Sequence, residues 1–385
     1  MSGVKSKNES GRSGPGRLRK ILLLILSIPV FIFAVEIIFT IIPIDTYFQN
    51  RFFLVNRALD YPEVFKKDGL VFWRLRPSQN ISSKFFEGKE YRINSCGLRG
   101  DEIADKSEKL RIIAIGNSCT FGWGIGEEQT YIHRLGDLIN NDASMPDIEV
   151  INGGVPGYST FQGRRFFISD IVPLKPDVVL IMFAWNDQWA AAGNIADKDQ
   201  EMPPEIVLKI QNLFSRLKLY RLIKKLTLSV VEKPLEEQLV KDAPVYRVSI
   251  PDFYNNLEFI VQYCKREGIT PILLTSPIPS LEKYYPPGKQ SMMHIYHQYY
   301  NQQIHSLARS TGAGMVDLAR EFNRYDDLFD DAVNDPIHFN ARGHRVAAAE
   351  IYQVIKEQDI LGSMDSRFKR QALGRAATQA YGRQK

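Results

Sequence analysis

The sequence predicts an α/β protein, a three-layer sandwich in which helices cover a mostly parallel five-stranded sheet, preceded by a single transmembrane helix. Two observations carry this prediction. From residue 111 onward, five continuously apolar runs alternate with helical patterns, which is typical of a parallel sheet buried on both faces. Near the N-terminus, residues 21–42 form an apolar run whose one charge is Glu36, and about 20 such residues span a bilayer.

The N-terminal segment predicts a membrane anchor over residues 21–43. Arg17, Arg19 and Lys20 precede the apolar run, and positive charge stays on the cytoplasmic side. We therefore expect a basic cytoplasmic tail at 1–20, a single pass through the inner (cell) membrane, and the bulk of the chain in a periplasmic or extracellular position. A cleaved signal peptide and a buried soluble helix are the alternatives. A signal peptide would normally have a shorter apolar region and small residues at its cleavage site.

Three further parts follow the anchor. Residues 44–108 read as a small β-rich extension of short aromatic strands with a turn at Gly97 and Gly100. Residues 109–360 form the main domain, and 361–385 a basic tail. The predicted strands of the main domain are 111–115, 148–151, 177–183, 270–276 and 314–318, and its predicted helices are 127–141, 159–170, 252–267, 289–311 and 342–357. A charged, helix-leaning insertion at 190–246 interrupts the alternation after the third strand.

Composition and charge exclude several classes of protein. With 44% hydrophobic residues in 385, the chain has enough apolar material for a folded core. Its net charge of +5 comes from the two ends, because the rest holds 37 basic and 42 acidic residues, so we expect no nucleic-acid partner.

Cysteine and histidine spacing gives no sign of a cofactor. Cys96, Cys119 and Cys264 have no C-x-x-C spacing, which disfavours a disulfide framework or a zinc site. His294 and His297 have no third ligand nearby in the sequence. We therefore predict no metal and no cofactor.

Polar residues follow the predicted strands where each strand ends. Ser118 follows the first strand, Gly154 the second and Asn186 the third, while Asp335 and His338 precede the last helix. Ligands collect beyond the carboxyl ends of parallel strands, so we expect these groups to meet at one edge of the sheet.

Together these groups fit nucleophilic catalysis. A serine hydroxyl needs an adjacent base, which His338 can supply, and Asp335 can orient that imidazole. The N–H groups of Ser118 and Gly154 and the amide of Asn186 would then stabilise an oxyanion.

The blocks GNSCTFG, NGGVPG, AWND and DPIHFNARGH resemble, in order, those of the SGNH/GDSL hydrolase superfamily, over about residues 109–358. The resemblance implies a flavodoxin-like sheet of order 2-1-3-4-5, Ser118 as nucleophile, Gly154 and Asn186 as oxyanion donors, and Asp335 with His338 as the base pair. The segment INSCGLRGDE is similar to the lead-in of membrane-anchored bacterial members. The sequence departs from the family twice: Asn117 replaces an aspartate, and Ala184 replaces the glycine of G-x-N-D.

Aromatic residues near these blocks predict a binding rim. Their flat faces can stack on sugar rings, although they can equally pack the edge of the sheet. Arg247 can contact an anionic substrate or pair with an acid. We predict this substrate-binding set: Trp123, Tyr158, Trp185, Trp189 and Arg247.

The sequence thus predicts a serine-dependent acyl-ester hydrolase that acts outside the cytoplasm and deacetylates an envelope or extracellular glycan. Two alternatives stay open: an O-acyltransferase of the same fold that modifies a polysaccharide, and a non-catalytic glycan-binding envelope protein. Water as the resolving nucleophile gives the esterase, whereas a sugar hydroxyl gives the transferase.

Overall fold

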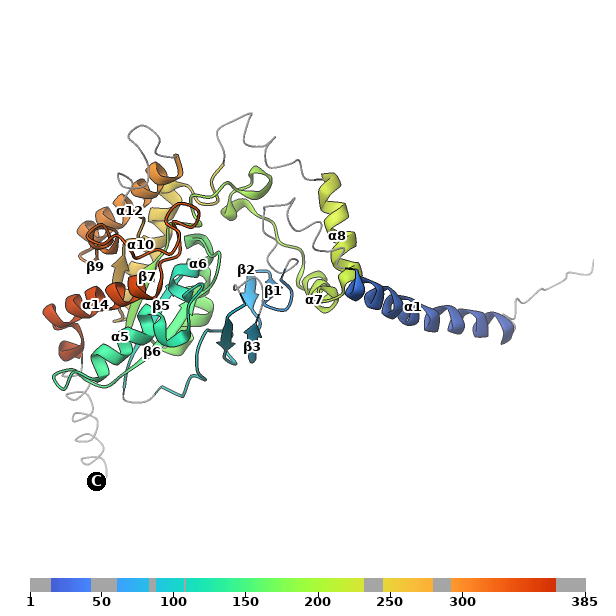
Figure 1. The fold of residues 1–385 in the computed structure, drawn as a ribbon, viewed down its shortest axis with the longest axis horizontal. Coiled ribbons are helices and arrows are strands. Elements are labelled where there is room, and N and C mark those ends of the chain that lie inside the picture. Colours follow the sequence, from blue (N-terminus) through green and yellow to red (C-terminus); the bar gives the residue numbers. More distant parts are fainter. Residues whose placement is uncertain are drawn as a thin grey trace, which may run out of the picture.

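A computed structural model describes residues 15–42, 61–82, 88–106, 109–231, 245–279 and 292–364. Its centre is a five-stranded parallel sheet in the order β6-β5-β7-β8-β9 (Figure 1). In chain order this is 2-1-3-4-5, so the predicted fold class and strand order are confirmed. The strands are β5 (Leu110–Gly116), β6 (Ile148–Gly154), β7 (Val178–Met182), β8 (Thr270–Leu274) and β9 (Gly314–Val316).

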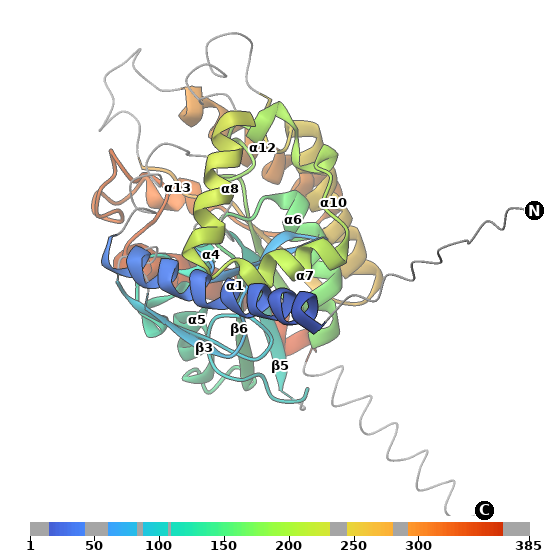
Figure 2. The same cartoon turned by 90° about the vertical axis from the view of Figure 1, so that its right-hand side faces the viewer.

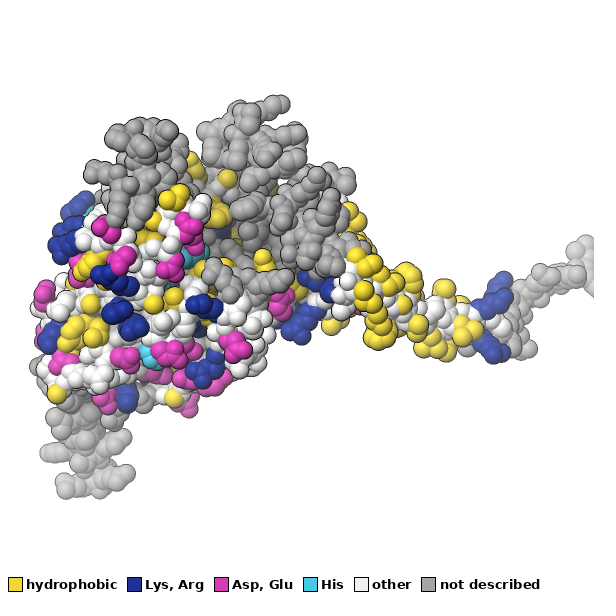
Figure 3. Space-filling view, in the orientation of Figure 1, with side chains coloured by type: hydrophobic (Ala, Val, Ile, Leu, Met, Phe, Trp, Pro, Cys, Tyr) yellow, Lys and Arg dark blue, Asp and Glu magenta, His cyan; other side chains and the backbone are white. Residues whose placement is uncertain are grey.

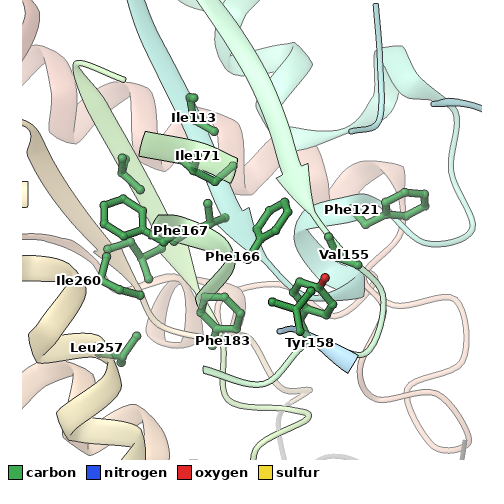
Figure 4. Close-up of a cluster of buried hydrophobic side chains, with 14 of the residues drawn as sticks. Ile113, Phe121, Val155, Tyr158, Phe166, Phe167, Ile171, Phe183, Leu257 and Ile260 are labelled. Carbon is green, nitrogen blue, oxygen red and sulfur yellow. The ribbon is translucent and has the colours of Figure 1, made fainter. Parts of the chain in front are cut away.

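Helices cover both faces of this sheet because successive residues of each strand point to opposite sides. Ile113 and Ile115 of β5 belong to one apolar cluster (Figure 4), and Ile112 and Ala114 belong to the other. The first cluster lies under α6 (Thr160–Phe166), α10 (Ile250–Arg266) and α12 (Met292–Thr311). The second lies under α5 (Tyr131–Asn140), α13 (Leu318–Phe322) and α14 (Ala341–Glu357).

The carboxyl ends of the central strands lie level with one another. Gly116, the last residue of β5, pairs with Gly154 of β6 on one side and with Met182 of β7 on the other. Because all five strands are parallel, the segments that follow β5, β6 and β7 leave the sheet at the same edge. The short helix α4 (Ser118–Phe121) begins there, two residues after the end of β5.

The extension before the main domain forms two antiparallel hairpins. They pair β1 (Phe65–Asp68) with β2 (Phe72–Leu75), and β3 (Gln79–Ser82) with β4 (Glu90–Ile93). Arg99 follows them and bridges to Asn152 of β6. Its buried guanidinium donates to the carbonyls of Phe121, Gly122 and Ile125, at 2.6–2.8 Å. The extension therefore supports the segment that contains α4.

Helix α1 (Pro15–Ile41) extends away from the α/β domain and carries an apolar surface (Figure 3). Its stretch Arg19–Ile41 is long and apolar enough to cross a membrane or to be a signal sequence. The insertion contains two helices, α7 (Glu205–Phe214) and α8 (Lys218–Val231), which lie beside α1 (Figures 1 and 2).

Some element boundaries differ from the sequence prediction. The strand expected at 314–318 ends at Val316, and α13 begins at Leu318. The helix expected at 127–141 starts as a 3-10 turn, Glu127–Gln129, before α5. Parts of the predicted anchor end, extension, insertion, fourth helix and both basic tails lie outside the described residues, at 1–14, 43–60, 83–87, 107–108, 232–244, 280–291 and 365–385.

Candidate active site

Ser118 stands at a tight turn from strand β5 into helix α4. Asn117 is the N-cap of that helix, and its side-chain oxygen accepts a hydrogen bond from the Cys119 N–H at 3.0 Å. A Cβ on Gly116 would overlap the Thr120 side chain and the Met182 carbonyl. Glycine at 116 therefore permits the close turn that presents the Ser118 hydroxyl at the edge of the sheet.

Ser118 joins His338 and Asp335 in one hydrogen-bonded line. The Ser118 hydroxyl lies 2.8 Å from Nε2 of His338, and Nδ1 of His338 lies 2.8 Å from Oδ2 of Asp335. A carboxylate only accepts, so Nδ1 carries the proton that it donates to Asp335. Nε2 of the neutral ring is then an acceptor for the Ser118 hydroxyl, which is the arrangement that a general base requires.

The Asp335 carboxylate is held in place by its own loop. Its Oδ1 accepts hydrogen bonds from the backbone N–H groups of Ile337 and His338, at 3.2 Å each. Burial tends to raise the pKa of Asp335, but these bonds and the His338 side chain together bring that pKa below its ordinary value. Asp335 is therefore charged in the resting site and able to stabilise an imidazolium.

Two of the predicted oxyanion donors are free to receive a ligand. The Ser118 N–H has no acceptor among the described residues. The side chain of Asn186, which is 7% exposed, likewise has no hydrogen-bond partner there. Asn186 follows Ala184, whose φ of 125° lies in the region that favours glycine.

Gly154 does not occupy the position that the sequence analysis gave it. It is the last residue of β6 rather than part of a turn, and its N–H donates to the Asn152 side chain at 3.0 Å. A Cβ at Gly154 would overlap the backbone of Thr120 and Phe121. Gly154 thus permits β6 to pack against α4, and its N–H does not face a substrate.

Gly157, which the sequence analysis did not single out, lies in the turn that follows β6, three residues after Gly154. Its φ is 83°, and its N–H has no acceptor among the described residues. Its carbonyl accepts a hydrogen bond from Arg247 at 2.8 Å. The segment NGGVPG contains three glycines, and the sequence does not show which of them has a positive φ and a free N–H.

Arg247 is a structural clamp rather than a free substrate contact. Besides Gly157, its guanidinium contacts the Gln162 side-chain oxygen at 2.6 Å and the buried Asp197 carboxylate at 2.8 Å. Asp197 also accepts from the Ser159 hydroxyl. These contacts tie the end of the insertion to the turn that carries Gly157.

Asp187 links the same turn to the loop after β7. One oxygen of its buried carboxyl accepts from the N–H and the hydroxyl of Thr160, at 2.7 and 2.6 Å. The other oxygen has no partner among the described residues. Burial raises the pKa of Asp187 to about 7, against the opposing effect of the Thr160 hydrogen bonds.

The sequence model of the GDSL-like Lipase/Acylhydrolase family matches residues 114–346. The chain belongs to this family. The resemblance seen in the sequence blocks is confirmed, and the protein is a hydrolase of ester bonds. The sequence matches no curated protein.

Solved structures similar to this GDSL-like protein include three hydrolases. An acetylxylan esterase from Geobacillus stearothermophilus is 18% identical, with a TM-score of 0.42 over 64% of this chain and 94% of the esterase. An α/β hydrolase from the metagenome of Lake Arreo, Spain, is 19% identical, with a TM-score of 0.43 over 64% and 94%. A lipase/acylhydrolase from Enterococcus faecalis is 18% identical, with a TM-score of 0.41 over 65% and 96%.

The aromatic rim predicted for this GDSL-like hydrolase is only partly present. Trp123 lies over the catalytic edge, where its half-buried ring stacks on His338 at 5.3 Å between centroids. Trp189 is half-buried, and its indole nitrogen is sealed inside without a partner among the described residues.

The predicted rim positions of Tyr158 and Trp185 are wrong, because both side chains are fully buried. Tyr158 points into the cluster shown in Figure 4 and donates to the Trp73 carbonyl at 2.7 Å. Trp185 stacks on His297 at 4.0 Å and donates to the Pro277 carbonyl. Tyr158 belongs to one of the two apolar clusters and Trp185 to the other, so both rings are buried in the core.

Cys119, His294 and His297 are buried side chains of the GDSL-like domain. The Cys119 thiol contacts the Ile337 carbonyl, and burial raises its pKa far above the ordinary value, which makes it a poor nucleophile. The described residues contain no group of three or more His, Cys, Asp or Glu side chains placed to hold a metal ion.

Proposed function

We propose that this hydrolase works through a covalent acyl-enzyme on Ser118, with His338 as general base and acid and Asp335 as the residue that orients it. The observation that carries the proposal is the continuous line of hydrogen bonds from the Ser118 hydroxyl through His338 to Asp335, each 2.8 Å long. In this geometry the proton of the attacking hydroxyl has an acceptor before the reaction begins.

The reaction proceeds in two halves. Oγ of Ser118 attacks the ester carbonyl carbon while its proton passes to Nε2 of His338. The tetrahedral intermediate then expels the alcohol, which takes that proton as the C–O bond breaks. Water next attacks the acyl-enzyme, gives a proton to His338 and displaces Ser118, which recovers its proton as the carboxylic acid leaves.

We assign the oxyanion to three donors: the N–H groups of Ser118 and Gly157 and the side-chain amide of Asn186. Each is without an acceptor among the described residues, so none must break an existing hydrogen bond when charge develops. A donor of this kind typically contributes about 2.7–4 kcal/mol to the stabilisation of the transition state.

We further propose that the enzyme removes acetyl groups from a glycan outside the cytoplasm. Arg17, Arg19 and Lys20 precede or begin the apolar part of α1, so the positive-inside rule favours an outward α/β domain. Trp123 is the half-exposed aromatic ring beside His338, and such a face can stack on a sugar next to the reacting ester.

The catalytic proposal is tested with a fluorophosphonate probe and p-nitrophenyl acetate on the full-length protein in detergent. The native protein should label and turn over, and Ser118→Ala should do neither. Ser169→Ala, an exposed serine in the same domain, is the matched control and should behave as native. Label and turnover that survive in Ser118→Ala would refute the assignment, and a native protein that does neither would indicate a binding protein.

The substrate proposal is tested with Trp123→Ala. Its KM for an acetylated oligosaccharide should rise about tenfold or more, with little change for p-nitrophenyl acetate, since about 1.4 kcal/mol of stacking is lost. Trp123→Phe, which keeps an aromatic face, should retain most of the affinity. An equal loss on both substrates would contradict a sugar contact, and transfer of the acetyl group to added oligosaccharide would indicate a transferase.

A further inference from the structure

Helix α7 of the insertion has one face docked on the protein. The Asn212 side chain donates to the Lys67 carbonyl at 2.8 Å and accepts from the Lys67 N–H at 2.7 Å, so it pairs with the edge of β1. Leu208, four residues earlier, is buried, and a Cβ at Gly69 would lie 3.3 Å from it. Residues four apart share a helix face, so this face of α7 is fixed to the extension.

The opposite face of α7 is apolar and exposed. Ile206, Ile210 and Leu213 follow one another at helical spacing and are 64%, 49% and 73% exposed. At 100° per residue they lie on the far side of the helix from Leu208 and Asn212. The face with Leu208 and Asn212 packs on the protein, whereas the face with Ile206, Ile210 and Leu213 has no partner among the described residues.

Helix α8, which packs next to α1, also carries exposed apolar side chains. Ile223 and Leu226 of α8 are 55% and 45% exposed. Fifteen large apolar side chains beyond residue 42 are exposed in the described part of the chain, and seven of them lie on the 24 residues of α7 and α8. An apolar surface of this density marks an interaction site.

Glu36 connects this surface to the apolar helix α1. Its two carboxylate oxygens accept from the N–H groups of Lys218 and Leu219, at 2.9 Å each. The Lys218 ammonium donates in turn to the Phe39 carbonyl at 3.0 Å. Glu36 thus caps the N-terminus of α8, and the charge inside the apolar run has its partners in the insertion.

The position of Glu36 on α1 determines how deep the start of α8 lies in the bilayer. Glu36 lies six residues before Ile42, or about 9 Å along the helix at 1.5 Å per residue. Helices that lie in the membrane interface bury their apolar face by about 5–10 Å. The start of α8 therefore stands at interface depth when α1 spans the bilayer.

The charge of the two helices favours a lipid surface over an apolar protein partner. Residues 205–231 contain one acidic residue and six basic ones: Lys209, Arg216, Lys218, Arg221, Lys224 and Lys225. A basic helix with one exposed apolar face binds anionic phospholipid both by burying its apolar side chains and by electrostatic attraction to the headgroups.

We propose that α7 and α8 lie in the headgroup layer of the outer leaflet, as a second membrane contact locked to α1 by Glu36. This proposal rests on the membrane anchor that the sequence predicts for residues 21–43 and on the outward α/β domain proposed above. The bilayer receives Ile206, Ile210, Leu213, Ile223 and Leu226, and the anionic headgroups receive the exposed Lys209 and Arg216. The catalytic domain is then held close to the membrane in one orientation rather than on a free tether.

The experiment uses the full-length protein in nanodiscs that contain anionic phospholipid and nitroxide-labelled lipid. In a Cys96→Ser background, an environment-sensitive fluorophore is attached through Ile210→Cys or Leu213→Cys. Leu24→Cys on α1 reports on the anchor. Leu138→Cys is the matched control, because Leu138 is 39% exposed on α5, which lies away from α1 (Figure 1). Thermal unfolding of each variant verifies that it is folded.

Fluorescence at positions 210 and 213 should shift to the blue and fall about twofold or more with a nitroxide near the headgroups, while position 138 stays unquenched. Quenching at position 24 but not at 210 or 213 would overturn the second contact and leave the anchor in place. A blue shift without quenching would show a protein partner instead of lipid and would also overturn it. No quenching at position 24 would refute the anchor and the contact together.

Discussion

The two halves of the proposed active site are built in opposite ways. The nucleophile half, Ser118 with His338 and Asp335, is held by hydrogen bonds among its own members. The oxyanion half, Gly157 and Asn186, has its donors unoccupied and is positioned from outside. Groups that exchange a proton must already touch, whereas donors that await a developing charge must not be satisfied beforehand.

Each half also depends on one arginine from outside the sheet. Arg99, from the extension, donates to the carbonyls of Phe121 and Gly122 at the end of α4. Arg247, from the end of the insertion, donates to the carbonyl of Gly157. The extension and the insertion therefore contact different halves of the same site.

The largest expected effect comes from breaking the nucleophile half at Asp335. Asp335→Asn should lower kcat/KM by about 10⁴, because an amide can donate to Nδ1 and so favours the wrong imidazole tautomer. The measurement is steady-state hydrolysis of p-nitrophenyl acetate. Asp330→Asn, an exposed residue of the same loop, should keep kcat/KM within a few-fold of native, and a loss of similar size there would assign the effect to the loop.

The second prediction concerns the buried acid behind the oxyanion half. In the folded protein the pKa of Asp187 is raised from 3.8 to about 7, so between these pH values the folded state binds more protons than the unfolded state. The stabilisation that this proton gives is complete below pH 3.8 and is lost as pH rises to about 7, which amounts to on the order of 4 kcal/mol.

Asp187→Asn should remove that loss, because asparagine does not titrate. The difference in free energy of unfolding between native and variant, from denaturant titrations at several pH values, should therefore change across this range. Asp199→Asn, an exposed neighbour, should show a constant difference from native. A constant difference for Asp187→Asn would mean that the Asp187 carboxyl is already ionised at low pH.

The sequence predicted the nucleophile half better than the oxyanion half, because strand ends can be read from the sequence whereas turn conformations cannot. The positions of Ser118 and His338 follow from strand ends and local spacing, and the structure brings the two side chains together. Gly157 could not be separated from Gly154 by spacing, because a free N–H depends on which turn the chain adopts. The burial of Tyr158 and Trp185 depends on neighbours far away in the sequence. The role of Glu36 could not be predicted either, because its partners Lys218 and Leu219 lie in the insertion, about 180 residues later in the sequence.

The third prediction breaks the oxyanion half at Arg247. Arg247→Ala releases the Gly157 carbonyl, so the turn loses its fixed orientation and kcat should fall about 10- to 100-fold, part of what a lost donor costs. KM should change little, and fluorophosphonate should still label Ser118 slowly. Arg247→Lys should recover part of kcat because one donor returns.

One control and one contrary result test this role for Arg247. Arg266→Ala, an exposed arginine on α10, is the control for loss of positive charge and should be neutral. A rise in KM with unchanged kcat in Arg247→Ala would instead make Arg247 a substrate contact, as the sequence analysis suggested.

The smallest expected effect is on the free energy of unfolding, and it concerns Ala184 in the oxyanion half. Its φ of 125° costs a residue with a Cβ about 1–3 kcal/mol, which exceeds the roughly 0.5–1 kcal/mol that glycine loses through a more flexible unfolded chain. Ala184→Gly should therefore raise the free energy of unfolding by about 1 kcal/mol. Ala191→Gly, also buried but without a positive φ, should lower it by a similar amount. If both variants are destabilised, the strain at Ala184 is smaller than its buried methyl group is worth, and the oxyanion half tolerates alanine without cost.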